Sequence, residues 1–194
     1  MLATNELFMK IIGITGTLGA GKGTIVEYLT KEYGFVHFSV RDFLLEEIKK
    51  RKLIANRDTM VMIANELRAD NSPSYIVDKL YENALKSKCN CIIESIRTLG
   101  EVVSLRNIGD FTLFAVDASP PIRYKRIVLR DSETDRIAYN TFLENEEREM
   151  NSTDPNKQNL RKCIDMADFV FSNNTSKEDL YAQLFTVLNK MVLS

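Results

Sequence analysis

The sequence predicts an α/β fold in which a five-stranded parallel sheet lies between two layers of helices. Five short apolar runs alternate with longer segments of helical spacing, and connections of that length are crossovers rather than hairpins. The runs are almost continuous in Ile, Val and Phe, as expected of strands buried on both faces. In order, the expected strands are Lys10–Thr15, Phe35–Val40, Cys89–Ile93, Phe111–Val116 and Asp168–Phe171.

The intervening segments carry the apolar stripes of amphipathic helices. One stripe, with the spacing i, i+3, i+4, i+7, consists of Met60, Ile63, Ala64 and Leu67. A similar stripe near the carboxyl terminus consists of Leu180, Leu184, Val187, Leu188 and Met191. The most polar stretch, residues 131–156, is expected to leave the sheet edge as a small helical lid. No repeat and no long linker interrupts the chain, which favours one domain over residues 1–194.

Composition limits the class of protein. Of 194 residues, 44% are hydrophobic and 27% are charged, which suits a packed globular chain rather than a disordered one. The 26 basic and 27 acidic residues nearly cancel, so no net field favours nucleic acid or an anionic membrane as a partner. No apolar run is long enough to span a bilayer, and Met1–Lys10 lacks the pattern of a secretion signal. Three cysteines are too few for a disulfide framework, so we expect a reduced, cytoplasmic protein.

The strongest functional signal is a glycine-rich loop between the first expected strand and an amphipathic helix. A backbone that wraps a polyphosphate must point successive N–H groups inward, and glycine permits that curvature. The helix N-terminus adds partial positive charge, and Lys22 can reach the β- and γ-phosphates. An ordinary glycine-rich turn is the alternative interpretation. The residues expected to bind ATP are Gly16, Thr17, Leu18, Gly19, Ala20, Gly21, Lys22, Gly23 and Thr24.

The loop departs from the general phosphate-loop pattern at one position. That pattern places Ser or Thr directly after the lysine, where the hydroxyl ligates Mg²⁺, but Gly23 stands there and Thr24 follows. The Lys-Gly-Thr sequence resembles the adenylate-kinase variety of the loop. This resemblance implies that phosphates and waters hold most of the Mg²⁺ shell, with Thr24 at the phosphates. Glu94 is expected to reach the ion through water.

Positive charge outside the loop favours a kinase over a nucleotide-dependent switch. The nearest match to a guanine-reading Asn-Lys-x-Asp motif, residues 156–159, lacks the aspartate. Residues 120–130 begin with two prolines and form a helix whose arginines, at i, i+3 and i+7, share one face. This face follows a strand directly, so it can overlook the strand ends where ligands bind. A solvated face is the alternative. We expect Arg123 and Arg126 to be catalytic and Arg130 to bind ATP.

Further side chains are candidates for contact with a phosphoryl acceptor. Glu94 ends a buried strand and could either reach Mg²⁺ through water or cap a helix. Arg97 could clamp an acceptor phosphate or form a surface ion pair. Asp42 could position a substrate hydroxyl by accepting its hydrogen bond, or cap the helix that follows it. Arg57 and Arg68 could bind an acceptor anion, although solvated side chains are the simpler expectation.

Three residues belong to types that often take part in catalysis, but they are expected to have structural roles here. His37, the only histidine, alternates within an apolar strand and is expected in the core. Cys89 and Cys91 are expected to be buried strand residues rather than a redox pair.

Together these residues resemble the nucleoside-monophosphate-kinase superfamily of P-loop phosphotransferases. A group of adenylate-kinase-related proteins known largely from archaea is similar at Glu94–Val102, Ser119–Pro121, Arg123–Arg126 and Phe142–Met150. Dephospho-CoA kinase is similar at Ile12–Gly16, Val116–Pro120, Arg130–Asp131 and Ala167–Asn174. The resemblance implies the three-layer α/β/α fold of P-loop NTPases. It also implies that the three arginines of residues 120–130 lie near the ATP phosphates and the lid.

The same resemblance implies that Asp42, Glu94 and Arg97 lie near the acceptor. Two positions depart from it, because Leu45 and Asn145 stand where related proteins carry arginine. These replacements leave less positive charge for the phosphate of an acceptor nucleotide.

The sequence therefore predicts an ATP- and Mg²⁺-dependent kinase that transfers the γ-phosphoryl group to a nucleotide-like acceptor, foremost a nucleoside or deoxynucleoside monophosphate. One alternative is a dephospho-CoA kinase that phosphorylates a ribose hydroxyl. Another is a nucleotide-binding regulatory module with slow ATPase. The acceptors differ in what they need, since a phosphate oxygen requires arginines and a hydroxyl benefits from a carboxylate such as Asp42. Closure of the lid would exclude water from the transfer.

Overall fold

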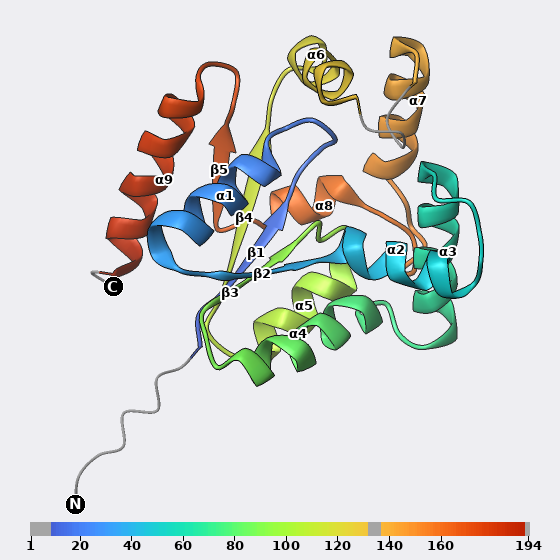
Figure 1. The fold of residues 1–194 in the computed structure, drawn as a ribbon, viewed down its shortest axis with the longest axis horizontal. Helices are drawn as coiled ribbons and strands as arrows, with labels where there is room; N and C mark the ends of the chain where they lie inside the picture. The colour runs from blue at the N-terminus through green and yellow to red at the C-terminus, as the bar shows by residue number, and fades with distance from the viewer. Residues whose placement is uncertain (1–8, 132–136, 193–194) are drawn as a thin grey trace, which may run out of the picture.

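A computed structural model describes residues 9–131 and 137–192 and places a parallel sheet at the centre (Figure 1). Its strands are β1 (Ile11–Thr15), β2 (Val36–Ser39), β3 (Cys91–Glu94), β4 (Phe111–Asp117) and β5 (Phe169–Ser172). The strand order is β2-β3-β1-β4-β5, and every pairing is parallel. The predicted five-stranded parallel sheet is therefore confirmed, and each strand overlaps its expected run.

Helices connect the strands and form the two outer layers. They are α1 (Lys22–Tyr33), α2 (Val40–Lys50), α3 (Arg57–Asp70), α4 (Tyr75–Ser87), α5 (Leu99–Ile108), α6 (Pro120–Arg130), α7 (Tyr139–Met150), α8 (Leu160–Asp165) and α9 (Lys177–Val192). Short polar side chains set several of their starts. Asn56 caps α3, and Thr98 with Glu101 forms a complete capping box on α5.

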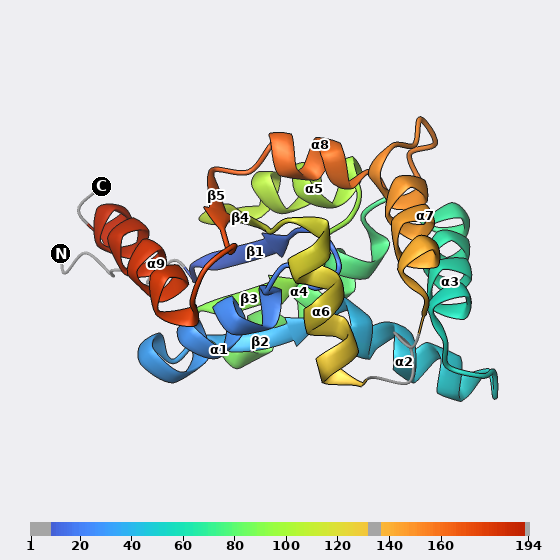
Figure 2. The same ribbon diagram turned by 90° about the horizontal axis from the view of Figure 1, so that it is seen from above.

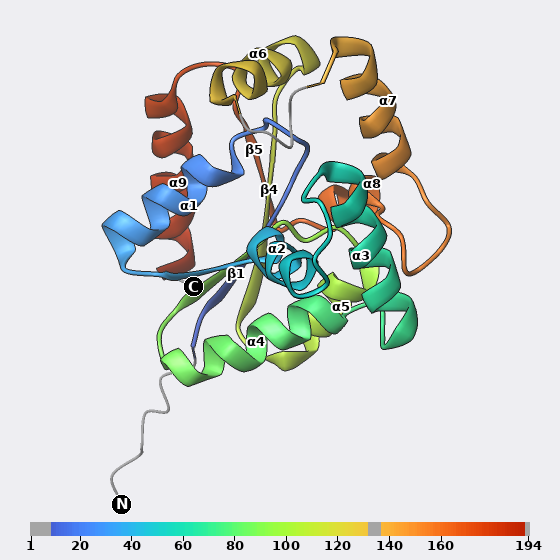
Figure 3. The same ribbon diagram turned by 45° about the vertical axis from the view of Figure 1, so that its right-hand side comes forward.

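The core lies on both faces of the sheet because strand residues alternate between them. Ile11, Cys91 and Leu113 face a cluster formed with α2, α3, α4, α5 and α8. Ile12 and Phe114 face a second cluster formed with α1 and α9. Figures 1 and 3 show α1 and α9 side by side on one side of the sheet, with α4 and α5 on the other. The predicted three-layer arrangement is thus confirmed.

Two helices extend beyond these layers at the carboxyl end of the strands. Seen from above, α7 lies beside α3, and α6 lies on the side of α7 that faces α1 (Figure 2). Helix α7 falls within the expected excursion at residues 131–156, of which residues 132–136 lie outside the described part. Its buried residues are Phe142 and Glu149. The amphipathic pattern of α7 therefore includes a buried charge.

Two expectations about single residues are wrong. His37 is exposed, because β2 is an edge strand whose outer face is not fully covered. Cys89 is also exposed, since β3 begins only at Cys91, which is buried as expected. Among the described helices, none has the length and apolar content needed to span a bilayer.

Candidate phosphate-transfer site

The loop that joins β1 to α1, residues 16–24, is called the P-loop below. Gly16 has a φ of 138°, and a Cβ there would lie 2.1 Å from the carbonyl oxygen of Val116, so only glycine fits. Gly21 has a φ of 112°, and its Cβ would lie 2.1 Å from Nδ2 of Asn173. No described side chain caps α1. The positive end of this helix is therefore available to an anion held by the loop.

A cavity of about 480 Å³ opens beside the P-loop and is bounded by α2, α3, α6 and α7. Three carboxylates line it, on Glu27, Glu94 and Glu149. Its cationic lining residues are more numerous: Lys22, Arg41, Arg57, Arg68, Arg97, Arg126 and Arg130. The chain as a whole has a formal charge of −1, so positive charge is concentrated at this cavity. Such a concentration favours an anionic ligand.

The cavity also has an apolar wall, opposite in character to its charged residues. This wall comes from α2 and α3 and consists of Val40, Leu44, Met60, Val61 and Ala64. A site with apolar walls and a few placed charged groups suits a ligand that has both a flat apolar part and anionic groups.

Lys22 folds back over the P-loop. Its Nζ donates hydrogen bonds to the carbonyl oxygens of Gly16 and Thr17, both at 2.9 Å. Burial, and after it the charge of Arg97, lowers the pKa of Lys22 to about 8, against the opposing charge of Glu94. The ammonium group is thus poorly compensated where it lies. A phosphate oxygen at the loop would supply the missing counter-charge.

Glu94 lies at the carboxyl end of β3, level with Ile14 of β1. Its Oε2 is 3.3 Å from Nε2 of His37 on the neighbouring strand. Burial by itself would raise the pKa of Glu94, but the hydrogen bond from His37 and the charge of Lys22 hold it below its usual value. Glu94 is therefore ionised at neutral pH.

Glu94 and Thr24 both line the cavity, and their oxygens are of the kind that Mg²⁺ prefers. No cluster of three or more His, Cys, Asp or Glu side chains that could hold a metal is present in the described part of the chain. These residues fit an ion whose remaining ligands are phosphate oxygens and water.

The three arginines expected on one face of α6 separate in the structure. Arg126 and Arg130 line the cavity, and Arg126 donates to Oδ1 of Asn173 at 3.3 Å. Arg123 is instead buried beside the P-loop, where its Nε donates to the carbonyl oxygen of Ala118 at 2.6 Å. Its Nη1 pairs with Glu146 of α7, and the guanidinium lies 5.3 Å from the ring centroid of Phe142. Arg123 therefore joins the P-loop to α7 and does not line the cavity.

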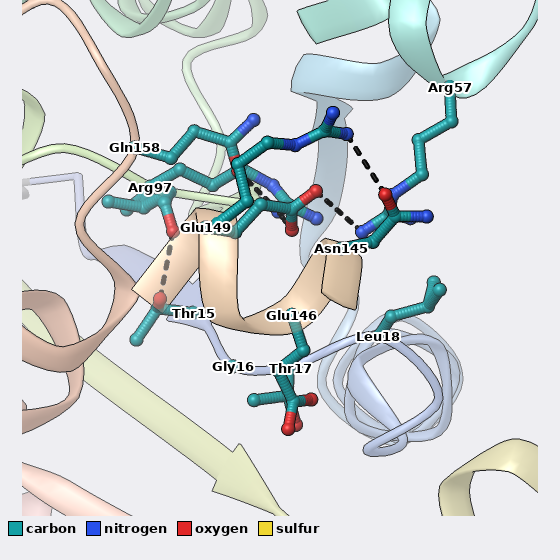
Figure 4. Close-up of polar contacts among 12 residues, drawn as sticks. Thr15, Gly16, Thr17, Leu18, Arg57, Arg97, Asn145, Glu146, Glu149 and Gln158 are labelled. Atoms are coloured by element: carbon teal, nitrogen blue, oxygen red, sulfur yellow. Dashed lines mark hydrogen bonds and ion pairs between the residues drawn. The ribbon is translucent and has the colours of Figure 1, made fainter. Parts of the chain in front are cut away.

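A buried ionic cluster also lines the cavity, close to the P-loop residues (Figure 4). Glu149 of α7 accepts a hydrogen bond from Nη2 of Arg57 at 2.6 Å and another from Nη1 of Arg97 at 2.7 Å. Nη1 of Arg97 also donates to Oε1 of Gln158 at 2.7 Å. The expectation that Arg57 is solvated is wrong, since its side chain is 12% exposed.

Arg68 also lines the cavity, but its charge is already compensated. Its Nε and Nη2 donate to Oε1 of Glu101 at 3.1 and 2.8 Å, and both side chains are fully buried. Oε2 of Glu101 accepts from the backbone N–H groups of Arg97 and Thr98. The expectation that Arg68 is solvated is therefore wrong. The pair instead fixes the backbone that carries Arg97.

Asp42 is exposed in the first turn of α2 and does not line the cavity. The helix begins at Val40, earlier than expected, and Ser39 caps it by accepting from the backbone N–H of Asp42 at 3.1 Å. Arg41 reaches the cavity instead. The Ser39-x-x-Asp42 spacing is a helix-start signal and would have placed this turn correctly.

The structure brings most of the predicted site residues to one cavity. Those that line it are Leu18, Gly19, Gly21, Lys22, Gly23, Thr24, Arg68, Glu94, Arg97, Arg126 and Arg130. Those placed elsewhere are Gly16, Thr17, Ala20, Asp42 and Arg123. The hydroxyl of Thr17, for example, donates to Asp117 Oδ1 at 2.7 Å. Sequence reasoning missed Arg41, Glu149 and Gln158, of which only Glu149 lay in a segment already singled out as a lid.

Comparisons with known proteins identify the family of the chain. A family model described as AAA domain matches residues 12–152. The UPF0200 protein MJ1399 of Methanocaldococcus jannaschii is 33% identical over 187 residues, covering 95% of this chain and 91% of that protein. A UPF0200 protein of Methanococcus maripaludis strain C7 is 31% identical over 188 residues, covering 95% and 98%.

Solved structures share the fold at low sequence identity. TT1252 from Thermus thermophilus has a TM-score of 0.63 at 19% identity and covers 94% of this chain and 97% of its own. Shikimate kinase from Bacteroides thetaiotaomicron has a TM-score of 0.51 at 12% identity, with coverages of 93% and 99%. These likenesses, the sheet order and the P-loop show a P-loop NTPase fold of the kind found in kinases. The chain belongs to the UPF0200 family and carries its AAA-type P-loop domain.

Proposed function

We propose that this protein is an ATP-dependent phosphotransferase whose acceptor is a phosphate monoester of nucleotide type, foremost a nucleoside or deoxynucleoside monophosphate. One observation carries the proposal: a single cavity joins the P-loop to the arginine cluster of Arg57 and Arg97. A donor phosphate at Lys22 and an acceptor phosphate at this cluster would thus share one space, and positioning of the two groups is most of what phosphoryl transfer requires.

Each group in the cavity has a role in this scheme. Lys22 would bind the phosphates of ATP, while Arg126 and Arg130 would compensate the charge that develops on the transferred group. An oxygen of the acceptor phosphate attacks the γ-phosphorus, and the bond from that phosphorus to the oxygen bridging to the β-phosphate breaks, giving ADP and a phosphorylated acceptor. Glu94 and Thr24 are the residues that would hold Mg²⁺, which would supply positive charge to screen the phosphates.

The charges in the cavity favour a phosphate acceptor over a hydroxyl. A hydroxyl must lose its proton to a base during transfer, whereas a phosphate oxygen is already ionised. Asp42, the base expected for a hydroxyl, does not line the cavity. Arg41 and Arg57 add the positive charge that the replacement of an expected arginine by Leu45 removed. The apolar wall of α2 and α3 would accommodate the nucleobase of the acceptor.

A coupled assay for ADP release tests the proposal. The acceptors are AMP, CMP, GMP, UMP, dTMP and dephospho-CoA, each compared with no acceptor. Acceleration by at least one monophosphate is expected. Acceleration by dephospho-CoA alone would exclude a phosphate acceptor, and release that no acceptor accelerates would exclude both kinase activities. Lys22→Met should lower transfer about 100- to 1,000-fold. The matched control Lys31→Met, an exposed lysine on the same helix, should leave it unchanged.

A further inference from the structure

The ionic cluster of Glu149, Arg57 and Arg97 has the geometry of a filled anion site. The two carboxylate oxygens of Glu149 each accept from a different guanidinium, Arg57 at 2.6 Å and Arg97 at 2.7 Å. The three side chains are 5%, 12% and 18% exposed, in that order. An oxyanion that takes one hydrogen bond per oxygen from two arginines is bound as a phosphate would be.

Electrostatics explain why a carboxylate occupies this place. Two buried guanidinium groups this close together repel each other and require a counter-charge. Burial alone would raise the pKa of Glu149, but the charges of Arg97 and Arg57 outweigh it and hold that pKa below its usual value. Glu149 is therefore an ionised internal counter-ion. It leaves the cluster with one positive charge rather than two.

The helix that carries Glu149 has few buried residues. Among the residues of α7, Phe142 and Glu149 are buried. Phe142 packs on Tyr124 at a ring-centroid distance of 5.7 Å, and Glu146 pairs with Arg123. An exposed pair of Arg148 with Asp58 at 3.2 Å adds to these contacts. A helix held largely by ionic side-chain contacts can be displaced when one of them is exchanged for a ligand.

We propose that Glu149 occupies the place of the acceptor's phosphate and that a phosphate dianion displaces it from Arg57 and Arg97. A monoanion that replaces Glu149 gains no charge over the carboxylate already present, whereas a dianion does. Glu149 is therefore a specificity-determining residue that admits phosphate monoesters and excludes carboxylates, and its displacement moves α7. The inference rests on the proposed function for the identity of the acceptor, but not for the exchange itself.

Binding of inorganic phosphate, with acetate as the monoanion, tests the exchange without any turnover. Glu149→Gln removes the competing charge, and Glu147→Gln removes the same charge from an exposed position on the same helix. Calorimetry should show phosphate binding about tenfold or more tighter in Glu149→Gln than in wild type or Glu147→Gln. Acetate should bind measurably to Glu149→Gln alone. Phosphate binding that is unchanged or weaker in Glu149→Gln would overturn the inference and make Glu149 a support for the arginines.

The P-loop also offers a phosphate site, so a control must show that the gain in phosphate affinity of Glu149→Gln arises at Arg57 and Arg97. In Arg57→Met/Glu149→Gln the gain should disappear, because the added affinity depends on Arg57. A gain that persists in the double variant would overturn the assignment. If Glu149→Gln does not fold, amide hydrogen exchange of residues 139–150 in the wild type serves instead. Saturating phosphate should speed the exchange of these residues. Unchanged or slower exchange would contradict the displacement of Glu149. A protein that passes these tests but phosphorylates no monophosphate would refute the proposed function alone.

Discussion

Replacing Arg68 by methionine should be strongly destabilising, because it leaves the carboxylate of Glu101 buried without its partner. Arg68 and Glu101 are 1% and 0% exposed, and two hydrogen bonds of 3.1 and 2.8 Å join them. Removing one member of a buried ion pair costs about 3–5 kcal/mol. For a chain of this length that corresponds to a fall in melting temperature of about 6–20 °C.

Urea denaturation of the wild type, Arg68→Met and Arg68→Met/Glu101→Gln measures this cost. The double variant should regain part of the lost stability, since glutamine removes the buried charge yet can still accept from the backbone N–H groups of Arg97 and Thr98. Lys79→Met, which breaks an exposed ion pair with Glu82, should change stability little. A loss below about 1 kcal/mol in Arg68→Met, or a double variant no more stable than the single one, would refute the reasoning.

Two other predictions concern the P-loop. The pKa of Lys22, lowered by burial and then by Arg97 to about 8, means that the empty site loses its ammonium charge as pH rises through 8. Because ATP favours the charged form, ATP affinity should fall above pH 8 with proton uptake on binding. Calorimetry in two buffers checks this, and a flat profile from pH 7 to about 9.5 would contradict it. Gly16→Ala should destabilise the protein and abolish nucleotide binding, because the added Cβ meets the carbonyl oxygen of Val116. Gly23→Ala should instead stabilise the protein by up to about 1 kcal/mol, because Gly23 lies in helix α1 with open space around it. Equal effects of the two glycine substitutions on denaturation would show that backbone geometry at Gly16 is not limiting.

Local patterns in the sequence were sufficient for the sheet and the P-loop. Apolar runs such as Phe111–Val116 identify buried strands because both faces of a central strand are covered, and the lengths between runs exclude hairpins. The P-loop is equally local, since its glycines, lysine and helix start are consecutive. The edge strand was the exception. The burial of His37 depended on whether another element covered β2, which no local pattern records.

The amino-acid sequence alone therefore determined the alternation of strands and helices along the chain, the phosphate loop and the charge of α6. All of these depend on neighbours a few residues apart. Only the tertiary structure decided which charges meet. Glu149 reaches Arg57 and Arg97 across sequence separations of 92 and 52 residues, and Arg68 pairs with Glu101 across 33. Whether a charged side chain is solvated, neutralised or turned toward a ligand depends on the dielectric and the partners that folding brings to it, and these long-range encounters leave no periodic trace in the chain.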